Sequence, residues 1–139
     1  MILFHSETDY ILSKKLLHKR WLSAIADSEG YRVGEINYIF CDDDYLLKLN
    51  LQYLQHDTLT DIITFDYVEG NVLNGDIYIS IERVIENSSI FSVPFEQELH
   101  RVLSHGLFHL CGYKDKTDEE AAEMRKKEEY AIRLFDTFE

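Results

Sequence analysis

The order in which strand-like and helix-like patterns follow one another constrains the fold of this chain more than any other feature. A short apolar start at residues 2–4 predicts an edge strand, and the alternation of residues 33–41 predicts a second strand. Two further β-rich runs, residues 62–67 and 76–79, are separated by a segment rich in glycine and asparagine, which is typical of a hairpin. The sequence therefore predicts about four strands.

Signals for helices lie between and after these strands. Ser6, with Asp9 three residues later, can cap a helix that runs to about Asp27. The acidic triplet at residues 42–44 supplies cap and first-turn carboxylates for a second helix through about Leu54. We therefore interpret this triplet as capping and not as metal binding.

Three more helices are predicted in the second half of the chain. Ser80 can cap the first of them, to about Ser88, and Pro94 can open the second. Thr117 and Glu120 form a capping-box signature for the third. The resulting order, β-α-β-α-β-β-α-α-α, predicts an α+β fold with one mixed sheet of about four strands packed by about five helices.

The composition is that of an ordered, globular protein. Its 139 residues are 45% hydrophobic with one proline, six glycines and no internal repeat, so we expect a single domain over residues 1–139. Two cysteines, Cys41 and Cys111, are too few for a disulfide framework and are expected to be reduced and partly buried. No apolar run approaches the roughly 20 residues of a membrane span, and residues 1–7 lack a basic secretory signal. We expect a cytoplasmic protein without a membrane segment.

The formal net charge of −12 argues against an extended nucleic-acid surface, because phosphate binding is normally driven by clustered lysine and arginine. The only dense basic cluster in the sequence is at residues 14–20, in the first predicted helix. We interpret this basic cluster as a solvated helix face.

Two histidines on a predicted helix carry the clearest chemical signal. His105 and His109 are four residues apart, so on a helix they project from one face, about 40° apart. Gly112 is placed to end this helix in the left-handed conformation, which would let Asp115 approach the same ion. Two neutral imidazoles and one carboxylate leave a fourth position vacant, the pattern of a catalytic metal centre. Zinc is the favoured metal, with nickel, cobalt and manganese as alternatives.

The third ligand and the reaction class are less constrained than the histidine pair. Asp115 also lies just before the last predicted helix, where a carboxylate is favourable without any metal, and Asp118 is a nearby substitute ligand. The histidine spacing is that of a zincin-like metal-site helix. However, Gly106 occupies the position at which zinc peptidases of the His-Glu-x-x-His type carry their general-base glutamate. The spacing is peptidase-like, whereas the chemistry is not.

Several motifs along the chain match one known pattern. They are Leu49-Asn50, Asp57 followed by residues 60–65 (Thr-Asp-Ile-Ile-Thr-Phe), residues 75–80 (Gly-Asp-Ile-Tyr-Ile-Ser) and residues 105–113, which read His-Gly-x-x-His-Leu-x-Gly-Tyr. With these motifs the chain resembles the YbeY family of endoribonucleases and ribosomal-RNA maturation factors over nearly its whole length. The resemblance implies a single-domain metalloprotein with a four-stranded sheet and a zinc-type site. It also implies hydrolysis of single-stranded RNA in ribosome maturation and quality control.

Two departures from the family pattern affect the expected chemistry. The family usually has Gly-Tyr-Asp-His with a third histidine ligand, whereas Lys114-Asp115 occupies those places here. The family also usually has an arginine where this chain has Leu54. Another group must then stabilise the charge that develops on the phosphate. The candidates are the metal itself, Arg101 and Lys114. A salt bridge with Glu98 is the alternative role of Arg101.

The resemblance favours a metal-dependent endoribonuclease in which the ion binds a phosphate oxygen and activates a water for in-line attack. A small metallopeptidase-like hydrolase and a ribosome-binding assembly factor with a structural metal are the alternatives. The expected partners are single-stranded ribosomal RNA, the small ribosomal subunit and a ribosome-assembly GTPase. The acidic net charge agrees with RNA binding if the basic cluster and the catalytic cleft form one positive region, or if docking on protein partners supplies the affinity.

The loop before the third predicted strand carries polar residues whose spacing does not define a role. We interpret Thr60 and Asp61 as residues that cap or hydrogen-bond this loop. His56 and Asp57 are candidates to orient a ligand imidazole.

Overall fold

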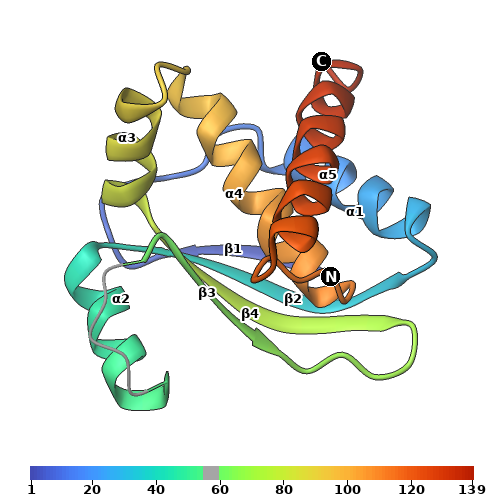
Figure 1. Ribbon diagram of the computed structural model, residues 1–139, viewed down its shortest axis with the longest axis horizontal. Coiled ribbons are helices and arrows are strands. Elements are labelled where there is room, and N and C mark those ends of the chain that lie inside the picture. Colours follow the sequence, from blue (N-terminus) through green and yellow to red (C-terminus); the bar gives the residue numbers. More distant parts are fainter. Residues whose placement is uncertain (55–59) are drawn as a thin grey trace.

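A mixed β-sheet organises the fold (Figure 1). The computed structural model describes residues 1–54 and 60–139, and within these residues the sheet has four strands in the order β1-β2-β4-β3. β1 pairs with β2 and β2 with β4 in parallel, whereas β3 runs antiparallel to β4. The strands span Ile2–Ser6 (β1), Arg32–Cys41 (β2), Ile62–Asp66 (β3) and Val72–Ser80 (β4). The predicted edge strand and hairpin are confirmed.

Five α-helices of the described residues cover this sheet unequally. In Figure 1, α1, α3, α4 and α5 lie on one side of the sheet and α2 lies on the other. The helices span Lys15–Ser28 (α1), Asp43–Leu49 (α2), Ile81–Ile90 (α3), Phe95–Leu110 (α4) and Asp118–Asp136 (α5). The predicted α+β class and element order are confirmed. In the described part of the chain, no helix has both the length and the apolar composition that a membrane crossing needs.

Side-chain caps start three helices where the sequence predicts them. The Asp42 carboxylate accepts a backbone hydrogen bond of 2.8 Å at the start of α2, and the Ser80 hydroxyl accepts one at the start of α3. Thr117 and Glu120 form the predicted capping box of α5, in which each side chain bonds to the backbone N–H of the other residue. The acidic triplet thus caps α2, as predicted.

The first helix begins later than the sequence predicts. α1 starts at Lys15, and Ser6 is the last residue of β1, where its hydroxyl donates to the Tyr10 carbonyl of the following loop at 2.6 Å. The Ser6 hydroxyl is engaged with this loop, where it accepts from the Thr8 N–H and bonds to the Thr8 and Tyr10 carbonyls, so it does not cap a helix. Leu12 of the same loop is 4% exposed and belongs to the hydrophobic core. The chain runs as a loop past this residue before it turns into α1.

The second helix extends through Leu54 as predicted, but with a wider turn at its end. A π-helical segment, η1 (Asn50–Leu54), continues α2. This turn places Asn50 and Leu54 on one wall of the cleft that also holds the two histidines. The candidate orienting residues His56 and Asp57 lie outside the described residues.

Helix α4 lies directly against the sheet because of a glycine. A Cβ atom at Gly106 would be 2.9 Å from Ile77 Cγ2 on β4 and 3.0 Å from Ile62 Cδ1 on β3. The close approach holds the histidine-bearing turns of α4 beside β3. The apolar residues of this helix that the sequence predicts to face the core are buried or partly buried: Phe95, Leu99, Val102, Leu103 and Leu110.

The basic cluster of residues 14–20 lies away from the cleft. Lys14 pairs with Glu139 at 3.3 Å, just beyond the C-terminal end of α5, whereas Asp115 precedes this helix. The 19 residues of α5 separate its two ends by about 28 Å. The cluster and the cleft therefore do not form one positive region. His18 also departs from the predicted solvated face, because it is 3% exposed and lies in the core against His100.

Candidate metal centre

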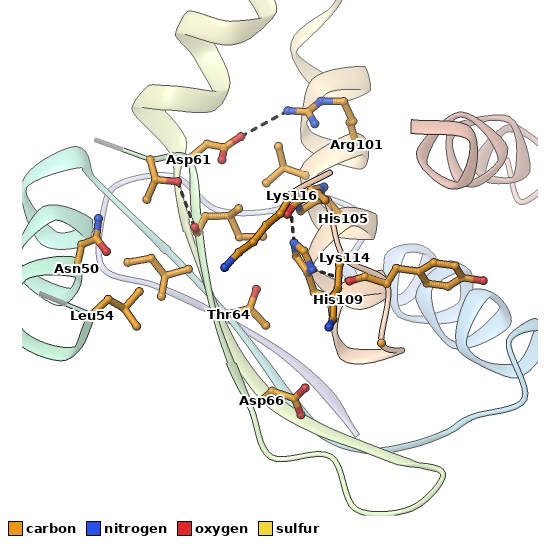
Figure 2. Close-up of a pocket in the computed structure, with 17 residues that line it drawn as sticks. Asn50, Leu54, Asp61, Thr64, Asp66, Arg101, His105, His109, Lys114 and Lys116 are labelled. Carbon is orange, nitrogen blue, oxygen red and sulfur yellow. Dashed lines mark hydrogen bonds and ion pairs between the residues drawn. The ribbon is translucent and has the colours of Figure 1, made fainter. Parts of the chain in front are cut away.

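The three predicted metal ligands lie together at the C-terminal half of α4. His105 and His109 project from successive turns of α4 (Figure 2), and Asp115 comes from the loop that joins α4 to α5. Asp115 Oδ2 lies 3.2 Å from His105 Nε2 and 3.4 Å from His109 Nε2. One donor atom from each residue lies within 4.8 Å of the other two, so the three side chains can share one ion.

A glycine-dependent turn brings Asp115 back to the histidines. Gly112 follows the end of α4 with a φ of +98°, the left-handed conformation predicted for it. Its backbone N–H donates to the His109 carbonyl at 3.0 Å. The N–H of Tyr113 donates to the Phe108 carbonyl at 3.0 Å, and the two rings pack edge to face at 5.7 Å. This pair of bonds with its hydrophobic contact is the Schellman motif.

Hydrogen bonds define which nitrogen of each imidazole is free. His105 Nδ1 is 2.5 Å from Glu128 Oε2. His109 Nδ1 is 2.9 Å from the Tyr113 carbonyl oxygen. Because a carboxylate and a carbonyl only accept hydrogen bonds, both Nδ1 atoms must donate, and each neutral ring carries its proton there. In a neutral ring of this kind, Nε2 has an unshared lone pair, and both Nε2 atoms face Asp115.

With both rings neutral, three electron-pair donors face one another. Such an arrangement is repulsive on its own and is stabilised by a cation at its centre. In a tetrahedral zinc site with bonds of about 2.0–2.1 Å, neighbouring ligand atoms are about 3.3–3.4 Å apart. The two distances from Asp115 Oδ2, 3.2 and 3.4 Å, are close to this value. Donor types, tautomers and spacing therefore fit a divalent transition metal ion.

The ligands open onto a cleft of about 830 Å³. Figure 2 shows Asn50 and Leu54 on the wall opposite the histidines, with β3 between the two walls. Lys114 and Lys116 line the cleft from the loop after α4. The charged residues of the lining are three acids and three bases: Asp61, Asp66, Asp115, Arg101, Lys114 and Lys116. The cleft is thus less acidic than the chain as a whole.

Arg101, a predicted phosphate contact, lines the same cleft but is ion-paired. Its guanidinium lies 2.6 Å from Glu98, 3.4 Å from Asp61 and 3.5 Å from Glu128. Burial lowers the pKa of Arg101, but the hydrogen bonds and charges of these carboxylates outweigh burial and raise the pKa above its ordinary value. The salt bridge to Glu98, its alternative role from the sequence, is present. Asp61 joins β3 to α4 through the same guanidinium.

Sequence reasoning missed Glu128, the residue that bonds to His105. Glu128 lies on α5 with its side chain 7% exposed. The signal that could have found it is its place among Met124, Ala131 and Phe135, which recur at helical spacing and are buried. An acid at a core position of an amphipathic helix requires a partner.

The alternative ligand Asp118 lies outside the three-residue cluster. Asp118 is the exposed first residue of α5. Cys111 is close in sequence but buried, and burial raises the pKa of its thiol to about 12. Both cysteines are free and buried, as predicted.

Comparisons with known proteins agree on one family. A family model described as Endoribonuclease YbeY matches residues 4–136. The Endoribonuclease YbeY of Flavobacterium johnsoniae is 56% identical over 135 residues, which cover 97% of this chain and 97% of that protein. The protein of the same name from Bacteroides fragilis is 50% identical over 121 residues, 87% of each chain. A solution structure from Thermotoga maritima is similar with a TM-score of 0.70 and 33% identity, over 97% of this chain and 89% of that one.

Proposed function

Because the chain belongs to the YbeY family of endoribonucleases, we propose that it is a metal-dependent enzyme that cleaves single-stranded ribosomal RNA. Family membership makes the chain a hydrolase that cleaves RNA internally and acts in ribosomal RNA maturation. Its proposed metal ligands are His105, His109 and Asp115, within one catalytic domain over residues 1–139. The observation that carries this metal centre is the convergence of three metal-ligating side chains at the edge of a cleft.

Zinc is the metal we propose, with one ion per chain. Two neutral imidazoles and a carboxylate suit zinc, and three protein ligands leave a fourth position toward the cleft. A bound ion would act as a Lewis acid that polarises a phosphate oxygen and lowers the pKa of the water that attacks the phosphorus in line. The chain holds both imidazoles in the required tautomer through the Nδ1 bonds to Glu128 and Tyr113.

Lys114 is the proposed contact for the charge that develops on the phosphate. It is exposed, lines the cleft and precedes Asp115 in the chain. Lys116 lines the same cleft on the other side of Asp115. Arg101 lies about one turn before His105 and stays in the proposal as a second cation. Its charge is shared with three carboxylates, so we expect a smaller contribution from it than from Lys114.

The charge of the cleft supports an anionic substrate in spite of the acidic chain. Acids and bases balance in its lining, three of each, and a divalent ion adds positive charge. The chain as a whole is acidic, with a net charge of −12, and its basic cluster of residues 14–20 lies away from the cleft, so the surface as a whole does not favour RNA binding. We therefore propose that docking on the small ribosomal subunit and on a ribosome-assembly GTPase supplies the affinity, in the cytoplasm.

Two alternatives are disfavoured by particular features. A peptidase of the His-Glu-x-x-His type needs a glutamate at position 106, but a Cβ atom there would already lie 2.9 Å from Ile77. A purely structural metal is expected in a closed site with four protein ligands, whereas this ligand set of three opens onto a cleft.

The test is cleavage of a labelled single-stranded RNA by the native chain and by Asp115→Ala, purified identically, each with zinc and with a chelator. We expect zinc-dependent cleavage by the native chain and its loss in the variant. Asp118→Ala removes a carboxylate three residues further on and should cleave like the native chain, which controls for a change of charge at the start of α5. Cleavage by Asp115→Ala at the native rate would remove the ligand assignment. No cleavage by the native chain would favour the assembly-factor alternative.

A further inference from the structure

We propose that Glu128 of α5 is a positioning residue of the metal centre and sets the affinity of the site for its ion through His105. This inference rests on the proposed function, since it takes His105, His109 and Asp115 as the ligands. Glu128 is not a ligand itself. Its Oε2 is bonded to Nδ1 of His105, while Nε2 of the same ring faces Asp115.

Glu128 stands where a carboxylate is unfavourable unless it is paired. Its side chain is 7% exposed, and Met124 and Ala131, one turn before and after it, are buried in the core. Both partners of Glu128 are on α4: His105 through Oε2 and Arg101 through Oε1. An apolar side chain would join α4 to α5 equally well, because buried ion pairs contribute little net stability. The charge of Glu128 therefore indicates a role beyond packing.

A second ion pair holds Glu128 in its orientation. Arg101 Nη1 lies 3.5 Å from Glu128 Oε1, and Arg101 lies one turn before His105 on α4 (Figure 2). The same guanidinium bonds to Glu98, which is 2% exposed, with Nη2 at 2.6 Å and Nε at 2.9 Å. One oxygen of Glu128 is thus held by a cation and the other is free to accept from the imidazole.

The imidazole of His109 is also supported from α5, through Lys127, the residue before Glu128. His109 Nδ1 donates to the Tyr113 carbonyl, and the Tyr113 hydroxyl donates to Glu29 at 2.6 Å. Glu29 pairs with Lys127 at 2.8 Å. Lys127 and Glu128 are consecutive, so α5 supports both imidazoles: Glu128 directly, and Lys127 through two intermediates.

A carboxylate on Nδ1 changes how well the opposite nitrogen binds a metal. It keeps the proton off Nε2, limits rotation of the ring and makes the Nε2 lone pair a stronger donor. Loss of such a partner typically lowers metal affinity roughly 10- to 100-fold. Glu128 is the only one of the two Nδ1 acceptors that is a side chain, so it is the one that substitution can remove.

The experiment measures the dissociation constants of zinc and of cobalt(II) for the metal-free full chain, by competition with a chromophoric chelator. Glu128→Gln keeps an oxygen that can accept from Nδ1 but loses the charge, and we expect about tenfold weaker binding. Glu128→Ala loses both, and we expect weakening of up to about 100-fold. The absorption spectrum of the cobalt(II) form should change in Glu128→Ala, because the ring of His105 is no longer held.

Glu123→Gln is the matched control, since Glu123 is an exposed acid of the same helix and should bind zinc like the native chain. Thermal unfolding of each metal-free variant separates the two roles of Glu128. A merely structural residue would lower the unfolding temperature and leave the affinity of the folded protein unchanged. Equal zinc affinities of the native chain and folded Glu128→Gln would overturn the inference while leaving the ligands in place. Failure of the native chain to bind zinc would overturn the proposed metal centre as well.

A measurement on the native chain covers the case in which Glu128→Ala does not fold. Nitrogen-15 NMR of the zinc-loaded protein reports which ring nitrogen of each histidine is protonated. We expect a proton on Nδ1 of His105 that exchanges slowly with water. In Glu128→Gln this proton should exchange faster. A His105 proton that exchanges rapidly, as in a ring without a protein acceptor, would contradict the proposed role.

Discussion

Three consecutive residues after Tyr113 divide two tasks between them. Asp115 directs its carboxylate at the two imidazoles, with Oδ2 at 3.2 and 3.4 Å from them. Lys114 and Lys116 flank it and line the cleft. The proposed metal ligand and two cations therefore come from one short loop, which would place lysine side chains beside the ion to receive the negative charge of an RNA phosphate.

We predict that Lys114→Ala slows RNA cleavage roughly 10- to 100-fold at saturating RNA, because a hydrogen bond to a charged group is worth about 1.5–3 kcal/mol. Zinc affinity should stay at the native value, since Lys114 is not a ligand. Single-turnover cleavage and chelator competition measure the two quantities. Lys126→Ala, at an exposed lysine of α5, is the control and should change neither. A native cleavage rate in Lys114→Ala would assign the phosphate contact elsewhere.

At the scale of elements, the width of the cleft depends on how closely α4 lies against β3 and β4. Gly106 is the contact point, with Ile62 on one strand and Ile77 on the other within about 3 Å of where a Cβ would be. The same turn of α4 carries His105. The packing of one glycine is therefore coupled to the position of a ligand.

We predict that Gly106→Ala destabilises the fold by up to about 2 kcal/mol. Alanine favours the helix by about 1 kcal/mol, but overpacking at a helix–sheet contact typically costs about 1–3 kcal/mol. Urea unfolding of the metal-free protein measures the difference. In an Ile62→Val background, which removes the methyl 3.0 Å away, the same substitution should cost less. A more stable Gly106→Ala protein would show that α4 has room to accept a methyl group.

Local chemistry explains which elements could be predicted from the sequence. Asp42, Ser80 and Thr117 cap helices through groups three residues away, so each signal is contained in four consecutive residues. Ser6 carries the same kind of pattern, yet α1 begins only at residue 15. The Ser6 hydroxyl bonds to Thr8 and Tyr10 of the following loop instead. Leu12 of this loop packs into the core, a contact that depends on the assembled fold rather than on neighbours in the chain.

The candidate site divides in the same way. His105, His109 and Gly112 belong to one helix and the turn that ends it, so periodicity and the glycine were sufficient to group them. Glu128 reaches His105 from 23 residues further along the chain. The pairing of Arg101 with Asp61 likewise depends on how β3 lies against α4. Contacts between elements require their packing to be known, and the sequence pattern does not contain it.

At the scale of the whole molecule, the core encloses a pair of histidines away from the metal centre. His18 on α1 and His100 on α4 are 3% and 6% exposed, with Nε2 atoms 3.2 Å apart, and both rings contact Phe135 of α5. Burial, with a smaller effect from His18, lowers the pKa of His100 to about 4. Burial also lowers the pKa of His18, although a hydrogen bond with the Lys14 carbonyl and, to a smaller extent, the charges of Glu96 and Glu139 oppose it. Both rings are neutral in the folded protein near pH 7.

We predict that the metal-free protein loses stability as the pH falls from about 6.5 to about 4. In this window the unfolded chain binds a proton at His100 and the folded chain does not, so the free energy of unfolding decreases as the pH falls. Above about pH 6.5 His100 takes up no proton in either state and does not lower the free energy of unfolding. By about pH 4 its protonation in the unfolded chain has lowered this free energy by roughly 3 kcal/mol. Urea unfolding at a series of pH values, with a chelator present, measures it. His100→Leu should flatten the curve in this window; an unchanged slope would place the proton uptake at other groups.

The helix that supports both ligand imidazoles is also the part of the centre that is synthesised last. α4 and the loop carrying Asp115 precede α5, so during translation the three ligands leave the ribosome before Lys127 and Glu128. On the proposed role of Glu128, the three ligands without α5 would hold the metal more weakly than the complete fold does. By this role, the ligand set alone does not give the full affinity for the ion, which requires α5 to be packed on α4.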